Sequence, residues 1–222
     1  MRTVVFDLDG TLADTSADLI EAANACFRAL GHGDRLDPVA DALTAFHGGR
    51  AMLRLGLSRL GIEDDTLVDA QYPALLEAYR RGIDRSTRLY PGAVEAVRRL
   101  RDDGFRTAIC TNKPEALAEL LLHRLGVRDL FDAMIGADTL PTRKPHPAPY
   151  TSAVQQAGGM VDRSILIGDT ETDAKTAKAA GVPCVLVSFG PEGPGLSRLN
   201  PAAMLDRYDD LPALAARFLP EV

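Results

Sequence analysis

Residues 3–11 read Thr-Val-Val-Phe-Asp-Leu-Asp-Gly-Thr, a short apolar run that ends abruptly in two aspartates. Continuous apolar, β-branched runs of this kind are typical of strands buried on both faces of a parallel sheet. Further runs of the same kind lie at residues 106–110, 164–167 and 183–188. Helical patterns separate these runs, at residues 91–103, 114–125 and 170–180. The alternation predicts a doubly wound, Rossmann-like α/β core with a parallel sheet.

The segment after the first strand breaks this alternation. Its apolar residues recur at helical spacing over residues 16–30, 39–46, 50–60 and 66–83, without a convincing strand. We therefore expect an α-helical cap over residues 15–85, inserted into an α/β core formed by residues 1–14 and 86–222.

Composition excludes several classes of function. The chain has 222 residues, of which 46% are hydrophobic and 25% charged, as in an ordinary globular protein. Its net charge of −6 and its lack of a block rich in lysine and arginine argue against nucleic acid or an anionic membrane as the main partner. No apolar run reaches the roughly 18 residues of a membrane span, and the first one stops too early for a signal peptide.

The cysteines indicate the cellular compartment. Cys26, Cys110 and Cys184 are an odd number without disulfide or metal-ligand spacing. Cys110 and Cys184 lie inside apolar runs, where a buried free thiol is expected. We therefore expect a cytoplasmic protein from a reducing compartment.

Polar side chains follow three of the predicted strands. The carboxyl ends of the strands carry Asp7 and Asp9, then Thr111, Asn112 and Lys113, then Asp169 and Asp173. Ligands of open α/β sheets bind at this edge, so these groups are expected to converge there. Lys144, in a proline-flanked segment, is expected to join them. Four carboxylates brought together repel one another unless a cation neutralises them, and oxygen ligands favour Mg²⁺. A lone aspartate would be read as a turn or cap residue, but the recurrence at two strand ends favours the metal site.

These motifs, in order, resemble those of the phosphatases of the haloacid dehalogenase-like hydrolase superfamily. The resemblance rests on the segments Asp7–Thr11, Thr111–Asn112, Lys144 and Gly168–Asp173. It spans nearly the whole chain, because residues 89–92, 144–147 and 177–181 are similar to the phosphoglycolate phosphatase branch. The insertion resembles the helical cap of that branch.

The resemblance implies a role for each matching residue. Asp7 would be the nucleophile that forms an aspartyl phosphate, and Asp9 the acid and base. Mg²⁺ would be held by Asp7, the Asp9 backbone carbonyl and Asp169, with Asp173 assisting. The phosphate-binding groups implied are Thr111, Lys144 and the backbone N–H groups of Leu8 and Asn112. For Thr111 an ordinary strand-end role stays open.

Three further residues have simpler interpretations. Asp14 is expected to cap the first helix of the insertion. Glu171 is expected as a first-turn acid, with an outer role at the metal left open. His146, between prolines, is expected to pack or to point to solvent.

The substrate is the least determined part of the prediction. Gly48, Gly49 and Arg50 at a helix start could bind an anion, so Arg50, with His47, is a candidate for the non-reacting end of a substrate. A surface arginine is an equally good interpretation. We expect a phosphate monoester, nominally 2-phosphoglycolate. The alternatives are a phosphomutase similar to β-phosphoglucomutase and a non-catalytic phosphate-binding regulator. No protein partner is indicated, and monomer or homodimer stays open.

Overall fold

The computed structural model describes residues 1–221. It divides into two compact units, Met1–Ala13 with Leu89–Val222, and Asp14–Arg88. The chain enters and leaves the second unit through β2 (Ala13–Asp14) and β3 (Arg88–Leu89), which form a two-stranded sheet. Within the described residues no helix combines the length and the apolarity that crossing a bilayer requires.

The first unit is built on a six-stranded sheet in the order β5-β4-β1-β6-β7-β8, and all neighbours are parallel. The strands are β1 (Thr3–Phe6), β4 (Arg106–Cys110), β5 (Ala133–Ile135), β6 (Ser164–Gly168), β7 (Cys184–Val187) and β8 (Ala203–Leu205). The α/β fold and all four strands that the sequence predicts are confirmed. The structure adds the two edge strands β5 and β8, which the prediction missed.

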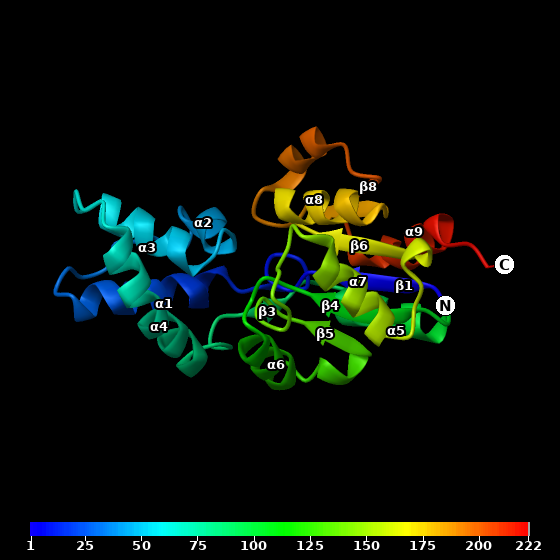
Figure 1. Ribbon diagram of the computed structural model, residues 1–222, viewed down its shortest axis with the longest axis horizontal. Helices are drawn as coiled ribbons and strands as arrows, with labels where there is room; N and C mark the ends of the chain where they lie inside the picture. Colours follow the sequence, from blue (N-terminus) through cyan, green and yellow to red (C-terminus); the bar gives the residue numbers. More distant parts are fainter. Residues whose placement is uncertain (222) are drawn as a thin grey trace. The chain divides into compact units, whose positions relative to one another are not determined.

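Helices cover both faces of this sheet (Figure 1). They are α5 (Ala93–Asp102), α6 (Glu115–Arg124), α7 (Pro147–Gln156), α8 (Glu171–Ala180) and α9 (Leu211–Phe218). On one face α7 packs against β4 and β5, and α8 packs against β6 and β7. The side chains that point toward these two helices come from neighbouring strands in register. They include Val5, Ala108 and Leu166, which are fully buried beside Tyr150 of α7.

The chain runs from β1 outward through β4 and β5, then returns to the other side of β1 through β6. This reversal makes β1 the central strand of the doubly wound sheet, with β4 and β6 as its neighbours. Phe6 is in register with both Ile109 and Ile167. The residues that follow these three strands therefore begin side by side at one edge.

The second unit is helical. It consists of α1 (Ser16–Ala29), α2 (Ala42–Phe46), α3 (Gly49–Ser58) and α4 (Asp65–Arg81), with α1 packed against the other three. A Cβ atom on Gly56 would lie 2.1 Å from the Phe27 ring, so glycine lets α3 approach α1 closely. The helix predicted over residues 39–46 begins only at Ala42. The Asp37 carboxylate accepts hydrogen bonds from the Val39 and Ala40 N–H groups and so stabilises a turn there instead of a helix.

All three cysteines are free and buried, as expected for Cys110 and Cys184. Burial raises the pKa of the Cys110 thiol to about 12. The thiol therefore stays protonated and packs as a small apolar group.

Candidate active site

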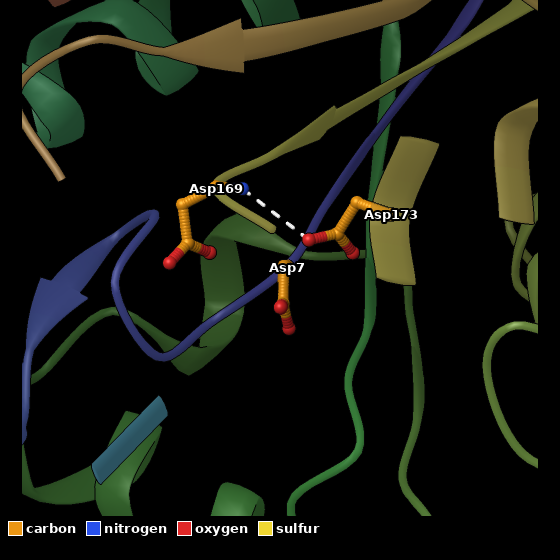
Figure 2. A group of neighbouring side chains, drawn as sticks. All are labelled: Asp7, Asp169 and Asp173. Carbon is orange, nitrogen blue, oxygen red and sulfur yellow. Dashed lines mark hydrogen bonds between the residues drawn. The ribbon is translucent and has the colours of Figure 1, made fainter. Parts of the chain in front are cut away.

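Three aspartates gather where β1 and β6 end. Oxygen atoms of Asp7, Asp169 and Asp173 lie within 4.8 Å of one another, and all three residues are buried. Asp7 follows β1, Asp169 follows β6, and Asp173 reaches back from the first turn of α8 (Figure 2). The sequence prediction that these carboxylates converge is therefore met in the geometry.

Local structure explains how Asp173 reaches this point. Its Oδ2 accepts a hydrogen bond from the Thr170 N–H (3.1 Å), which is one half of a capping box at the start of α8, and another from the Thr170 hydroxyl (2.7 Å). The Asp169 N–H donates to the same oxygen at 3.3 Å, the dashed line in Figure 2. A Cβ atom on Gly168 would lie 2.4 Å from the Asp173 side chain. Only glycine at 168 lets the helix place its carboxylate against the strand end.

Lys144 bridges two of the carboxylates. Its Nζ lies 3.0 Å from Asp7 Oδ2 and 2.6 Å from Asp173 Oδ1, and the side chain is buried. The Asn112 side-chain amide donates to the Lys144 carbonyl at 3.0 Å and fixes this segment. Although burial acts to lower it, the pairs with Asp173 and Asp7 raise the pKa of Lys144. The ammonium group is therefore a permanent charge beside the aspartates.

A second buried lysine pairs with Asp9. Lys113 Nζ lies 2.7 Å and 2.8 Å from the two Asp9 carboxylate oxygens. The Lys113 N–H donates to Thr111 Oγ1 at 3.2 Å, which shapes the loop after β4. Lys113 was expected at this edge of the sheet, but no role was predicted for it. Its position directly after the Thr111–Asn112 pair, at the end of a buried strand, was the available signal.

The Leu8 backbone N–H points at the Asp7 carboxylate and donates to its Oδ1 at 2.7 Å. Burial raises the pKa of Asp7 to about 6, and the negative charges of Asp173 and Asp9 add to that effect against the attraction of Lys144. Burial, together with repulsion from Asp7 and Asp173, also raises the pKa of Asp169 well above its usual value. Without a bound cation, ionising these groups is costly.

This donor set fits a divalent cation. When ionised, the four site carboxylates outnumber the two lysine ammonium groups by two charges. Asp169 Oδ2 is buried without a hydrogen-bond partner, while Asp169 Oδ1 accepts from the Thr11 hydroxyl at 2.8 Å. An unpartnered buried carboxylate oxygen costs stability unless a ligand occupies it. All-oxygen ligands suit hard divalent cations, of which Mg²⁺ is one.

The other candidates have simpler surroundings. Glu171 is exposed and pairs with Lys175 on the same helix at 3.2 Å. The Asp14 carboxylate accepts from the Ser16 N–H (3.0 Å) and hydroxyl (2.6 Å), but Thr15, not Asp14, stands at the N-cap of α1. The exposed His146 caps α7 by accepting from the Ala148 N–H at 3.1 Å.

The cap candidates lie in the helical unit. Arg50 Nε donates to Asp69 Oδ1 at 2.7 Å, and its guanidinium lies 3.9 Å from the centre of the Tyr72 ring. Its side chain keeps 42% of its surface exposed. His47 ends α2, and its N–H donates to the Thr44 carbonyl at 3.1 Å.

Comparison with known proteins gives one consistent result. Residues 1–181 match the family model of the haloacid dehalogenase-like hydrolases. The chain is 37% identical over 209 residues to a phosphoglycolate phosphatase of Mesorhizobium japonicum, covering 94% of this chain and 92% of that protein. It is 36% identical over 218 residues to a phosphoglycolate phosphatase of Rhodospirillum rubrum, covering 95% and 89%. A crystal structure of a predicted phosphoglycolate phosphatase from Haemophilus somnus has a TM-score of 0.85 at 23% identity, covering 96% of this chain and 97% of that one.

Proposed function

Because this chain belongs to the haloacid dehalogenase-like hydrolase family and is a phosphatase, we propose that it hydrolyses 2-phosphoglycolate or a similar small phosphate monoester with Asp7 as nucleophile. The observation that carries the proposal is the buried cluster of Asp7, Asp169 and Asp173 with Lys144 at the end of the central strand. The relatives named as phosphoglycolate phosphatases support the choice of substrate.

In the first step an Asp7 carboxylate oxygen bonds to phosphorus as the bond from phosphorus to the ester oxygen breaks. Asp9 gives its proton to the departing alcohol oxygen. The product on the enzyme is an aspartyl phosphate, a type of intermediate that carboxylates support. The Leu8 N–H and Lys144 Nζ fix the Asp7 oxygens, so the nucleophile needs little reorganisation.

In the second step Asp9 takes a proton from water as the water oxygen bonds to phosphorus and the bond to Asp7 breaks. Phosphate leaves, and Asp9 has recovered the proton that it gave away. Lys113 pairs with both Asp9 oxygens and so fixes the orientation of the group that moves both protons. Microscopic reversibility is satisfied because one residue performs both transfers.

Asp7, Asp169, Asp173 and the Asp9 backbone carbonyl would hold Mg²⁺. When bound, the cation would neutralise the excess negative charge and let an anionic nucleophile meet an anionic ester. Lys144 and Thr111 supply positive charge and a hydroxyl to the phosphate oxygens, with the backbone N–H groups of Leu8 and Asn112. Phosphoryl transfer depends mainly on such positioned donors, because charge spreads over the equatorial oxygens.

Arg50, with His47, binds the carboxylate of 2-phosphoglycolate in this proposal. Support comes from the chemistry of the group: an exposed guanidinium, held by Asp69 and by the Tyr72 ring, is an ordered cation on the helical unit. Arginine binds carboxylates in bidentate geometry, which suits a small anionic substrate.

The experiment is phosphate release from 2-phosphoglycolate, hexose phosphates, nucleoside monophosphates and pyrophosphate, each with Mg²⁺ and with EDTA. We expect Mg²⁺-dependent turnover with 2-phosphoglycolate preferred, and none from Asp7→Asn. The Asp162→Asn variant is the control, because it makes the same change at an exposed residue of the 3-10 helix Val161–Arg163, outside the site. Isomerisation of a hexose phosphate without phosphate release would favour the mutase. No turnover of any ester would contradict the proposal.

A further inference from the structure

Tyr208 connects the C-terminal part of the chain to the loop after β1. It begins the short 3-10 turn Tyr208–Asp210 and is almost fully buried. Its hydroxyl donates a 2.6 Å hydrogen bond to the backbone carbonyl of Thr11, 197 residues earlier in the sequence. Burial raises the pKa of Tyr208 well above its usual value, so the hydroxyl keeps the proton that it donates.

The Thr11 residue held by Tyr208 is itself hydrogen-bonded to Asp169. The Thr11 residue has no exposed surface, and its hydroxyl donates to Asp169 Oδ1 at 2.8 Å. The other carboxylate oxygen, Asp169 Oδ2, is buried and has no hydrogen-bond partner. The bond from Thr11 therefore decides which oxygen of Asp169 is engaged and which one is left for a ligand.

Aromatic contacts hold Tyr208 in place. Its ring lies 5.3 Å from that of Phe189, which in turn lies 4.9 Å from that of Tyr90, measured between ring centres. The Tyr90 N–H donates to the Leu12 carbonyl at 3.0 Å, next to the carbonyl that Tyr208 holds. Two residues of this aromatic cluster therefore hold successive carbonyls of the loop, Tyr208 that of Thr11 and Tyr90 that of Leu12.

We propose that Tyr208 is a positioning residue for the cation site, acting through Thr11 to present Asp169 Oδ2 to the metal. The inference rests on the proposed function, because it takes Asp169 as a metal ligand. Without the Tyr208 hydroxyl, the Thr11 carbonyl is buried without its donor, and the loop shifts to find another. Groups that orient a metal ligand from outside commonly change metal affinity by about 10- to 100-fold.

The test compares Tyr208→Phe with Tyr150→Phe. Both remove one buried hydroxyl, and Tyr150 donates to or accepts from Ser164 Oγ at 2.6 Å in the layer under α7. Mg²⁺ binding is measured by titration calorimetry, beside the Tm in EDTA. We expect Tyr208→Phe to raise the Kd for Mg²⁺ about 10-fold, while Tyr150→Phe lowers the Tm and leaves the Kd unchanged.

Substitutions at Thr11 check the second link. Thr11→Val removes the hydroxyl and is expected to weaken Mg²⁺ binding by at least as much as Tyr208→Phe. Thr11→Ser keeps the hydroxyl donor, so its Mg²⁺ affinity should match that of the wild type. An unchanged Kd in Tyr208→Phe with a lowered Tm would overturn the inference, because the hydroxyl would then be merely structural. A wild-type protein that binds no Mg²⁺ would instead refute the metal site of the proposed function.

Discussion

Replacing Asp7 by asparagine is expected to stabilise the metal-free protein while abolishing its activity. Asp7 is buried, and its pKa rises from 3.8 to about 6, chiefly through burial. The difference is about two pH units, and each unit corresponds to about 1.4 kcal/mol, so ionised Asp7 lowers the free energy of unfolding by about 3 kcal/mol at neutral pH. The amide carries no charge and removes this cost. Lys144 keeps a partner in the variant, because Asp173 lies 2.6 Å from its Nζ.

The pH dependence has a definite sign. The folded state binds the Asp7 proton more tightly than the unfolded chain, so wild-type stability falls as the pH rises from 3.8 to about 6. The advantage of Asp7→Asn should therefore be small near pH 4, reach about half its full size near pH 5, and level off at about 3 kcal/mol above pH 6.

Urea unfolding in EDTA, followed by far-ultraviolet circular dichroism, measures this difference, since the chain has no tryptophan. Asp18→Asn is the matched control: Asp18 is also buried, but it accepts hydrogen bonds from the Ser86 N–H and from the N–H and hydroxyl of Thr87. Asparagine at 18 cannot accept all of them, so that variant should be less stable than wild type. An Asp7→Asn protein less stable than wild type in EDTA at pH 7.5 would show that ionised Asp7 does not destabilise the metal-free fold.

Bound Mg²⁺ should reduce or reverse the stability difference between Asp7→Asn and the wild type. A ligand that binds only the folded state stabilises it by about 2.7 kcal/mol at 100 times its Kd. Asp7→Asn lacks one anionic ligand and should gain less from Mg²⁺ than wild type does. The gap measured in EDTA should therefore narrow or change sign in excess Mg²⁺, and an unchanged gap would contradict a role for Asp7 at the metal.

Other predictions concern the surroundings of the site. Lys113→Met should lower kcat about 100-fold with little change in KM, because the Asp9 carboxylate, the proposed acid and base, loses its fixed orientation. Lys175→Met, at an exposed helix position, should match wild type in the same steady-state assay. Gly190→Ala should lower stability by about 1–3 kcal/mol in urea unfolding, because its Cβ would lie 3.0 Å from a backbone oxygen of the loop after β1; equal stability would refute that contact. Arg50→Gln should raise KM for 2-phosphoglycolate more than 10-fold at similar kcat, since hydrogen bonds to charged groups contribute about 1.5–3 kcal/mol. The control is Arg54→Gln, on the same helix and paired with an aspartate at the same 2.7 Å, which should leave KM unchanged. Equal effects of the two substitutions would remove Arg50 from the substrate site.

The central strands were predictable because each is an apolar run of four or five residues buried on both faces. The edge strands β5 and β8 have three residues each, too short for a periodic signal. Their conformation comes from pairing with β4 and β7, which is a tertiary effect. A turn held by the Asp37 carboxylate likewise shortened α2, and that competition between side chain and helix depends on local geometry.

The site residues were predictable to the extent that they follow strands directly. Asp7 and Asp169 directly follow β1 and β6, and Asp9 and Asp173 come within a few residues of the same strand ends. This is why the sequence alone indicated that the carboxylates lie at one edge of the sheet. The sequence could not indicate which lysine pairs with which aspartate, because Lys113 and Lys144 are both plausible ion-pair partners of any nearby carboxylate. The contact of Tyr208 with the loop after β1 joins segments far apart in sequence, and no local pattern could indicate it.

The most direct test of the mechanism is to trap the phosphorylated enzyme. The wild-type protein is acid-quenched during turnover of its best ester with Mg²⁺, reduced with borohydride, and digested with trypsin, which releases Asp7 in the peptide from Thr3 to Arg28. An aspartyl phosphate is reduced to homoserine, so we expect homoserine at position 7 in samples quenched with substrate and aspartate in those quenched without it. Unmodified Asp7 during rapid phosphate release, or homoserine at another aspartate, would rule out Asp7 as the nucleophile.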